Sequence, residues 1–182
     1  TRAFGADAAR AAAQVSAWIE GCSAAGALSC AKHFPGHGRT TADSHLGRPV
    51  VDVDAETLDA ELAPFRASIR AGVDGIMTAH VAYPALDRTG APATLSHPIL
   101  HGLLRERLGF DGLVVTDALV LKGVTGSGAG VREAPDDGPD PGDDGPAPAG
   151  VAEAAVRAVA AGGDALLYPP DAAEAAEALE SA

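Results

Sequence analysis

The stretch KHFPGHGRTTADSH, residues 32–45, gathers three histidines, a lysine and an aspartate beside two glycines. Titratable groups at this density, next to glycines that let a backbone approach a ligand closely, indicate a functional loop. His33, His37, His45 and Asp43 offer the ligand types of a metal site. Their spacing, however, matches no metal-binding motif, and no phosphate-binding glycine pattern is present. A purely structural loop remains the default alternative.

Asp43 and His45 are separated by one residue and can pair within a tight turn. A carboxylate beside an imidazole orients the ring and favours its charged form. Such a pair can act as a general acid and base. Spacing alone does not decide between this dyad and a polar surface turn.

Asp117 ends the apolar run GLVVTD, residues 112–117. One interpretation is an N-cap for a following helix. The other is a nucleophile or base, because the end of a strand holds a side chain more rigidly than a loop does. The residue by itself leaves both interpretations open.

The elements that must position these residues follow from hydrophobic periodicity and from cap residues. In the first helix, Val15, Trp18, Ile19 and Cys22 form one predicted apolar face. A proline, Pro64, falls inside the second helix and predicts a kink or a break. Helices are expected at 7–25, 55–71 (capped by Asp54), from Ser96 to Gly109, at 151–161 and from about 171; strands are expected at 27–31, 73–80, 112–117 and 164–168.

Strict alternation of helices with buried strands predicts an α/β fold with a parallel sheet. An open doubly wound sheet and a (β/α)8 barrel both fit this order. The barrel is favoured because polar residues lie at or just past the carboxyl end of every predicted strand, namely Lys32–His33, His80, Asp117 and Tyr168–Pro169. Barrel enzymes place their chemistry at that end of the strands. Four strand–helix units would be the central to C-terminal part of such a barrel.

Residues 123–150 interrupt this order with a run of glycine, proline and aspartate that has almost no large apolar side chains. A segment of this composition cannot bury enough surface to offset the entropy of ordering it. We therefore expect one domain over residues 1–182 with a flexible insert at about 123–150.

The formal net charge of −12 argues against a nucleic-acid partner and against an anionic membrane surface. No run of 18 apolar residues free of charge is present, so no membrane span is expected. Cys22 and Cys30 are interpreted as small buried apolar residues rather than as a disulfide or zinc site. Low cysteine use fits the cytoplasm. Because the chain begins at Thr1, a preceding signal is conceivable, which leaves a periplasmic or secreted location open.

Four motifs carry a family resemblance. Residues 32–45, IMTAHVAYPALD at 76–87, PATLS at 92–96 and LGFDGLVVTDAL at 108–119 together strongly resemble glycoside hydrolase family 3. The similarity is greatest to its bacterial β-N-acetylglucosaminidase (β-hexosaminidase) branch. The resemblance implies a (β/α)8 barrel, a carbohydrate substrate and no cofactor or metal. It also implies cleavage of terminal β-linked sugars with retention, through a covalent glycosyl-enzyme.

The resemblance also implies the catalytic residues. Asp117 matches the nucleophile of the family, His45 matches the acid/base of this branch, and Asp43 matches its partner. Four further positions match residues or motifs assigned to sugar binding: Arg2, Lys32, His33 and His80.

The chain departs from the family in three places. The N-terminal strands are absent and the last strand region is cut short, so a fragment of a longer protein is expected. Lys122 stands where the family usually has methionine.

Expected substrates are peptidoglycan fragments or chito-oligosaccharides. A β-glucosidase or β-xylosidase of the same family and a non-catalytic carbohydrate-binding fragment remain alternatives, and the oligomeric state is left open.

Overall fold

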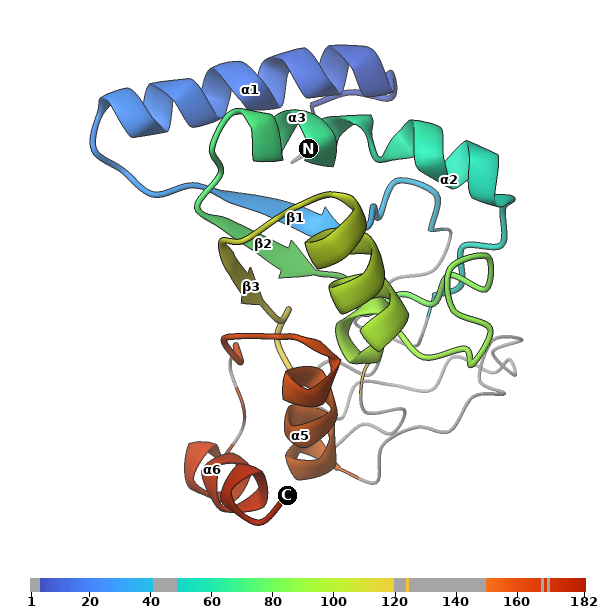
Figure 1. The fold of residues 1–182 in the computed structure, drawn as a ribbon, viewed down its shortest axis with the longest axis vertical. Helices are drawn as coiled ribbons and strands as arrows, with labels where there is room; N and C mark the ends of the chain where they lie inside the picture. The colour runs from blue at the N-terminus through green and yellow to red at the C-terminus, as the bar shows by residue number, and fades with distance from the viewer. Residues whose placement is uncertain (1–3, 41–48, 120–123, 125–149, 168, 170) are drawn as a thin grey trace, which may run out of the picture.

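The computed structural model describes residues 4–40, 49–119, 124, 150–167, 169 and 171–182. Within them helices alternate with strands along the chain, as the sequence predicts. Figure 1 shows the sheet at the centre, with helices α1 and α3 above it and helices α5 and α6 below it.

The sheet has three parallel strands in the order β1-β2-β3: β1 (Cys30–Phe34), β2 (Gly75–Thr78) and β3 (Leu113–Val115). The predicted parallel α/β class is therefore confirmed. Eight strands are not seen in the described residues, so the complete barrel stays a prediction. Strand polarity brings the carboxyl ends of β1, β2 and β3 to the same edge, where the candidate site lies.

Helix α1 (Ala8–Ala24) begins at Asp7, whose side chain accepts a hydrogen bond from the backbone N–H of Arg10, and packs along α3 (Ala63–Arg70). Ile19 is buried, as predicted, but the prediction that Trp18 lies on the same buried face is wrong, because its side chain is 62% exposed. Successive helical residues point about 100° apart, which follows from 3.6 residues per turn. The buried face centres on Ile19, so Trp18 falls outside it and contacts Phe4 instead.

The single helix expected at 55–71 is two helices, α2 (Ala55–Glu61) and α3. Asp54 caps α2 by accepting the backbone N–H of Thr57 at 2.7 Å, as predicted. Pro64 is the second residue of α3. Its ring fits the first turn of a helix but not a helix interior, which explains the break at Leu62.

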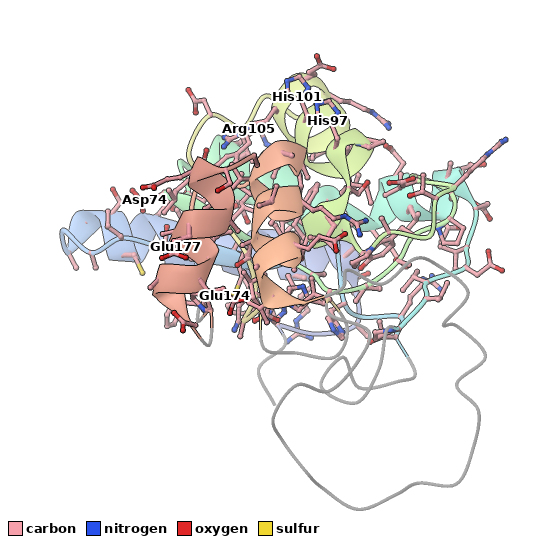
Figure 2. All side chains as sticks on the ribbon, turned by 90° about the horizontal axis from the view of Figure 1, so that it is seen from below. Asp74, His97, His101, Arg105, Glu174 and Glu177 are labelled. Carbon is pink, nitrogen blue, oxygen red and sulfur yellow. The ribbon has the colours of Figure 1, made fainter. Side chains whose placement is uncertain are left out.

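Between β2 and β3 the chain forms a 3₁₀ turn, η1 (Ala93–Leu95), and a π-helix, η2 (Pro98–Arg107). Ser96 Oγ accepts the N–H of Ile99 at 3.3 Å at the predicted start, and Gly109 follows the end with φ +70°. Arg105 of η2, labelled in Figure 2, binds Asp164 at 2.6 Å and the Gly112 carbonyl at 2.6 Å. It thereby ties the start of β3 to the segment that follows α5.

Helices α5 (Val151–Ala161) and α6 (Ala172–Glu180) agree with the prediction, and Asp171 caps α6. The prediction of a strand at 164–168 is wrong, because its described residues do not form one. Among them, Ala165 makes only an isolated parallel bridge to Val115. The ladder stops because the N–H of Leu167 binds the Thr116 hydroxyl at 2.9 Å instead of a backbone carbonyl.

The first strand, expected at 27–31, begins at Cys30 and ends at Phe34. The N–H of Ala27 still closes the end of α1 on Cys22, and the N–H of Ser29 binds the Asp74 carboxylate at 2.8 Å. Lys32 and His33 therefore lie within β1 rather than beyond its end. Alternation then turns Cys30 outward, so the prediction that both cysteines are buried is wrong: Cys30 is exposed and Cys22 is half-buried.

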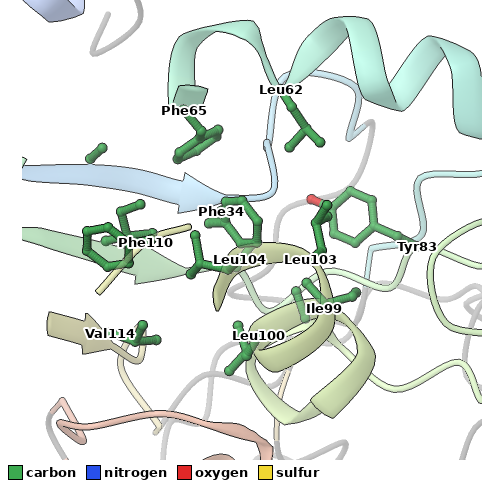
Figure 3. Close-up of a cluster of buried hydrophobic side chains, with 14 of the residues drawn as sticks. Phe34, Leu62, Phe65, Tyr83, Ile99, Leu100, Leu103, Leu104, Phe110 and Val114 are labelled. Carbon is green, nitrogen blue, oxygen red and sulfur yellow. The ribbon is translucent and has the colours of Figure 1, made fainter. Parts of the chain in front are cut away.

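Two apolar clusters stabilise the described residues. The central cluster contains large side chains from the sheet, α3 and η2; Figure 3 shows Phe34 and Phe65, whose rings meet edge to face at 5.1 Å. The second, which we call the alanine cluster, is built from Leu95, Leu119, Val124, Ala154, Ala155, Ala158 and Ala175. Apart from Val124 and Gly150, the insert expected at 123–150 lies outside the described residues.

Candidate active site

Asp117 lies two residues beyond β3, with a side chain 20% exposed. Its Oδ1 accepts the backbone N–H of Ala118 at 2.8 Å. Its Oδ2 lies 3.4 Å from Nε2 of His33. The carboxylate is thus held on one side and still reachable from solvent, as attack on a bound substrate requires.

A β-bulge brings His33 to Asp117. Lys32 pairs with Met77 and Phe34 pairs with Thr78, so His33 is an extra residue in the ladder. Bulges of this kind re-aim a side chain and are frequent beside active sites. The ring of His33 also meets the ring of His37 edge to face at 5.7 Å.

Burial lowers the pKa of His33 to about 4. The negative charge of Asp117 acts in the opposite direction, and the neighbouring Lys32, His37 and His80 lower the pKa further. Burial outweighs the attraction, because the free energy lost when a charged imidazole is removed from water exceeds the free energy gained from its attraction to one partly exposed carboxylate. At neutral pH the contact between His33 and Asp117 therefore joins a neutral ring to a carboxylate and is not an ion pair.

Tyr83 and Thr40 hold the loop that follows β1. The hydroxyl of the buried Tyr83 donates to the carbonyl of Gly36, and burial raises the pKa of Tyr83. Thr40 Oγ1 lies 2.7 Å from Nδ1 of His37. Sequence reasoning assigned no role to Tyr83 or Thr40, although Tyr83 lies inside the motif at 76–87.

His80 is buried beyond β2, with 1% of its surface exposed. Its Nδ1 lies 2.7 Å from Oγ1 of Thr94, and its Nε2 lies 3.0 Å from the carbonyl oxygen of Ala118. The expectation that His80 binds substrate stays a prediction. These contacts favour support of the Asp117 backbone over direct contact with a sugar.

The residues after His80 also hold the chain that enters α2. The N–H of Val51 binds the Ala82 carbonyl at 2.9 Å, and the N–H of Ala82 binds the Pro49 carbonyl at 2.9 Å. The segment from His80 to Tyr83 thus contacts three separate parts of the chain: the loop after β1, the chain before α2, and the end of β3.

The structure therefore brings His33, His80 and Asp117 together, with Lys32 exposed on β1 beside His33. Three other predicted site residues, Arg2, Asp43 and His45, lie outside the described residues, as does Lys122.

In the ranges that the structure describes, no three histidine, cysteine, aspartate or glutamate side chains are grouped so as to hold a metal ion. The metal alternative that includes Asp43 and His45 concerns residues beyond those ranges. None of the helices found in the described part of the chain has the length and apolar character needed to cross a membrane.

Comparisons with known proteins identify the family of the chain. The family described as "Glycosyl hydrolase family 3 N terminal domain" matches residues 1–182. Beta-hexosaminidase A of Pseudoalteromonas piscicida is 46% identical over 121 residues, which are 60% of this chain and 20% of that protein. Beta-hexosaminidase of Vibrio cholerae serotype O1 is 44% identical over 132 residues, 72% of this chain and 39% of the relative.

Among solved structures, the glycoside hydrolase family 3 beta-N-acetylglucosaminidase from Paenibacillus sp. str. FPU-7 superposes with a TM-score of 0.83. It is 39% identical, and the match covers 99% of this chain and 31% of that one. The chain thus spans less than half the length of each of these relatives.

Proposed function

The chain belongs to glycosyl hydrolase family 3, and from this membership we propose that the protein hydrolyses terminal β-linked N-acetylglucosamine with retention of configuration. The observation that carries the proposal is the carboxylate of Asp117 at the end of β3. One of its oxygens is held by the N–H of Ala118, and the other faces a neutral His33. The proposed scaffold is the corresponding part of a (β/α)8 barrel.

The reaction proceeds in two displacements. In the first, the Asp117 carboxylate attacks the anomeric carbon, the glycosidic C–O bond breaks, and His45 gives a proton to the leaving oxygen. In the second, water attacks the same carbon, His45 takes a proton from that water, and the bond to Asp117 breaks. Most retaining enzymes use a second carboxyl group here. An imidazole suits both proton transfers because its ordinary pKa is close to neutral pH, and Asp43 would orient it.

The neutral state of His33 supports this assignment of Asp117. A protonated His33 would pair with the carboxylate and weaken it as a nucleophile. A neutral ring leaves the negative charge available and can still exchange hydrogen bonds with sugar hydroxyls. Lys32 and Arg2 complete the proposed sugar contacts through charge-assisted hydrogen bonds.

The 2-acetamido group of the substrate is an alternative, internal nucleophile, and the match of Asp117 to the nucleophile of the family argues against it. The natural substrates we propose are peptidoglycan fragments or chito-oligosaccharides. A β-glucosidase or β-xylosidase with the same nucleophile, and a carbohydrate-binding protein without turnover, are the alternatives that the experiment separates.

The test is hydrolysis of p-nitrophenyl N-acetyl-β-glucosaminide and of p-nitrophenyl β-glucoside by the full-length protein. Asp117→Ala should slow turnover of the preferred substrate more than about 1,000-fold, which corresponds to about 4 kcal/mol in the barrier. Asp111→Ala removes an exposed aspartate near the opposite end of β3 and should keep the rate.

Each outcome of this test supports either the proposal or one of its alternatives. Faster release from the N-acetyl substrate, lost in Asp117→Ala only, supports the proposal. Faster release from the glucoside favours the β-glucosidase alternative. No release by a folded protein favours sugar binding without turnover. An Asp117→Ala variant with near-full rate would show that the nucleophile is another residue.

A further inference from the structure

The buried His80 links two threonines to the backbone beside Asp117. A carbonyl oxygen only accepts hydrogen bonds, so the 3.0 Å contact between His80 Nε2 and the Ala118 carbonyl requires a proton on Nε2. The neutral ring then accepts at Nδ1, where the Thr94 hydroxyl lies 2.7 Å away. The hydrogen-bond partners therefore select one tautomer of His80.

Thr94 is itself fixed, because it is fully buried and its Oγ1 lies 2.7 Å from Oγ1 of Thr78. The Thr94 hydroxyl has two possible acceptors, the carbonyl of Ala79 at 3.1 Å and Nδ1 of His80 at 2.7 Å. When it donates to the nearer one, Nδ1 of His80, the Thr78 hydroxyl can donate to Thr94. The carbonyl of Ala79 keeps a partner in this arrangement, since it accepts the N–H of Thr94 at 3.2 Å. The end of β2 and the 3₁₀ turn η1 thus hold the imidazole from behind.

Both backbone groups of Ala118 are engaged. Its N–H holds Oδ1 of Asp117 at 2.8 Å, and its carbonyl accepts from His80. On the following residue, the N–H of Leu119 binds the carbonyl of Leu167 at 3.0 Å. Any rotation of the backbone at Ala118 would therefore move the donor that orients the Asp117 carboxylate.

We propose that His80 is a positioning residue: in its Nε2–H tautomer, selected by Thr94, it fixes the carbonyl of Ala118 and thereby the orientation of the Asp117 carboxylate. This inference rests on the proposed function, in which Asp117 is the nucleophile. Misplacing a reacting group by about 1 Å can cost on the order of 100-fold in rate. The effect should fall on turnover, because His80 acts on the nucleophile rather than on the bound sugar.

Two amide variants test the contact with Ala118. The amide nitrogen of glutamine can reach the position of Nε2, whereas that of asparagine, one methylene shorter, matches Nδ1. In the full-length protein, His80→Gln should lose less than about tenfold in kcat, and His80→Asn about 100-fold. Thr94→Val should lose less than His80→Asn, and Thr94→Ser, which keeps the hydroxyl, should retain the rate.

A control separates positioning from general loss of structure. Titration with an S-linked N-acetylglucosaminide, which resists hydrolysis, counts the binding-competent sites and gives the Kd. Positioning predicts an unchanged Kd and a lower kcat per site in His80→Asn. Ser68→Ala removes another buried hydroxyl, which binds the Pro64 carbonyl inside α3, and should leave kcat per site unchanged.

The tautomer is tested without any activity by long-range ¹H–¹⁵N correlation of ring-¹⁵N histidine. The His80 signals, identified by their absence in His80→Gln, should show a protonated Nε2 and a bare Nδ1. A protonated Nδ1 with a bare Nε2 would overturn the inference even if the enzyme hydrolyses its substrate. So would an equal kcat per site in His80→Asn and wild type. A wild type without turnover would instead overturn the proposed function, and with it the role of His80 in catalysis.

Discussion

The central cluster and the alanine cluster are two cores of different construction. The central cluster fills its interior with Phe34, Phe65, Tyr83 and several leucines and isoleucines. The alanine cluster relies on the methyl groups of α5 and α6 together with two leucines and a valine. Because stabilisation by burial scales with the apolar area removed from water, the central cluster contributes far more per residue.

The candidate site spans the boundary between these clusters. His33 lies in β1 and His80 lies two residues beyond β2, and side chains of both strands belong to the central cluster. Asp117 is two residues before Leu119, which belongs to the alanine cluster. Near Asp117, the N–H of Leu167 binds the Thr116 hydroxyl and the carbonyl of Leu167 accepts the N–H of Leu119. The proposed nucleophile thus adjoins the alanine cluster, and His80 connects it to the central cluster.

Replacing one large side chain of the central cluster gives the largest expected effect on stability. Phe34 is fully buried and meets Phe65 edge to face. Phe34→Ala should lower the free energy of unfolding by about 3–5 kcal/mol, since it removes this contact and leaves a cavity. Urea unfolding followed by circular dichroism gives the value.

The matched change in the alanine cluster is Ala158→Gly, in the middle of α5, where Ala158 is fully buried. It should cost about 1 kcal/mol, most of it helix propensity. Equal losses for Phe34→Ala and Ala158→Gly would contradict the proposed difference between the two cores.

His33 should make stability depend on pH. Its pKa of about 4 in the folded protein lies below the ordinary value of 6.5, so between these values the unfolded chain binds more protons than the folded one. Stability should therefore rise with pH across this window, by at most about 1.4 kcal/mol per pH unit, and His33 should add no slope above it.

His33→Gln should remove this contribution while keeping a polar side chain in the bulge. The measurement is the free energy of unfolding of both proteins at several values between pH 4 and pH 7. Slopes that stay parallel throughout would show that His33 has the same pKa in the folded and the unfolded protein, so that its contact with Asp117 would be an ion pair at the acidic end of this range.

Structural features that are set by residues close together in the chain were easier to predict from the sequence than features set by residues far apart in it. Local signals were reliable: the cap at Asp54, the start of the last helix near residue 171 and the break before Pro64 all appear in the structure. The placement of Asp117 and His80 at the carboxyl ends of their strands followed from the apolar runs before them, although β2 and β3 each end two residues earlier than expected. These features are set within a few residues of the chain, where propensity and capping decide.

Longer-range features were not predictable from one sequence. The bulge at His33 depends on how β1 meets Met77 and Thr78, and the outward face of Cys30 depends on the same register. The interrupted ladder beside β3 depends on the hydroxyl of Thr116, 51 residues from Leu167. Nothing in the spacing of His80, Thr94 and Ala118 indicates that they meet, because the fold alone brings them together.

The smallest expected effect concerns residues 126–148, which lie outside the described residues. Their composition supports our proposal that this segment is an insert in a single domain, because it offers almost no apolar side chains to bury. Replacing it with a short Gly/Ser linker should change the free energy of unfolding by less than about 1 kcal/mol, since loop-closure entropy varies slowly with loop length. Val124 and the start of α5 are retained, so the alanine cluster keeps its members.

Thermal unfolding of the wild type and of the linker variant at equal concentration measures the difference. A loss as large as that of Phe34→Ala would mean that the segment packs against one of the cores, and the boundary between them would have to be redrawn to include it.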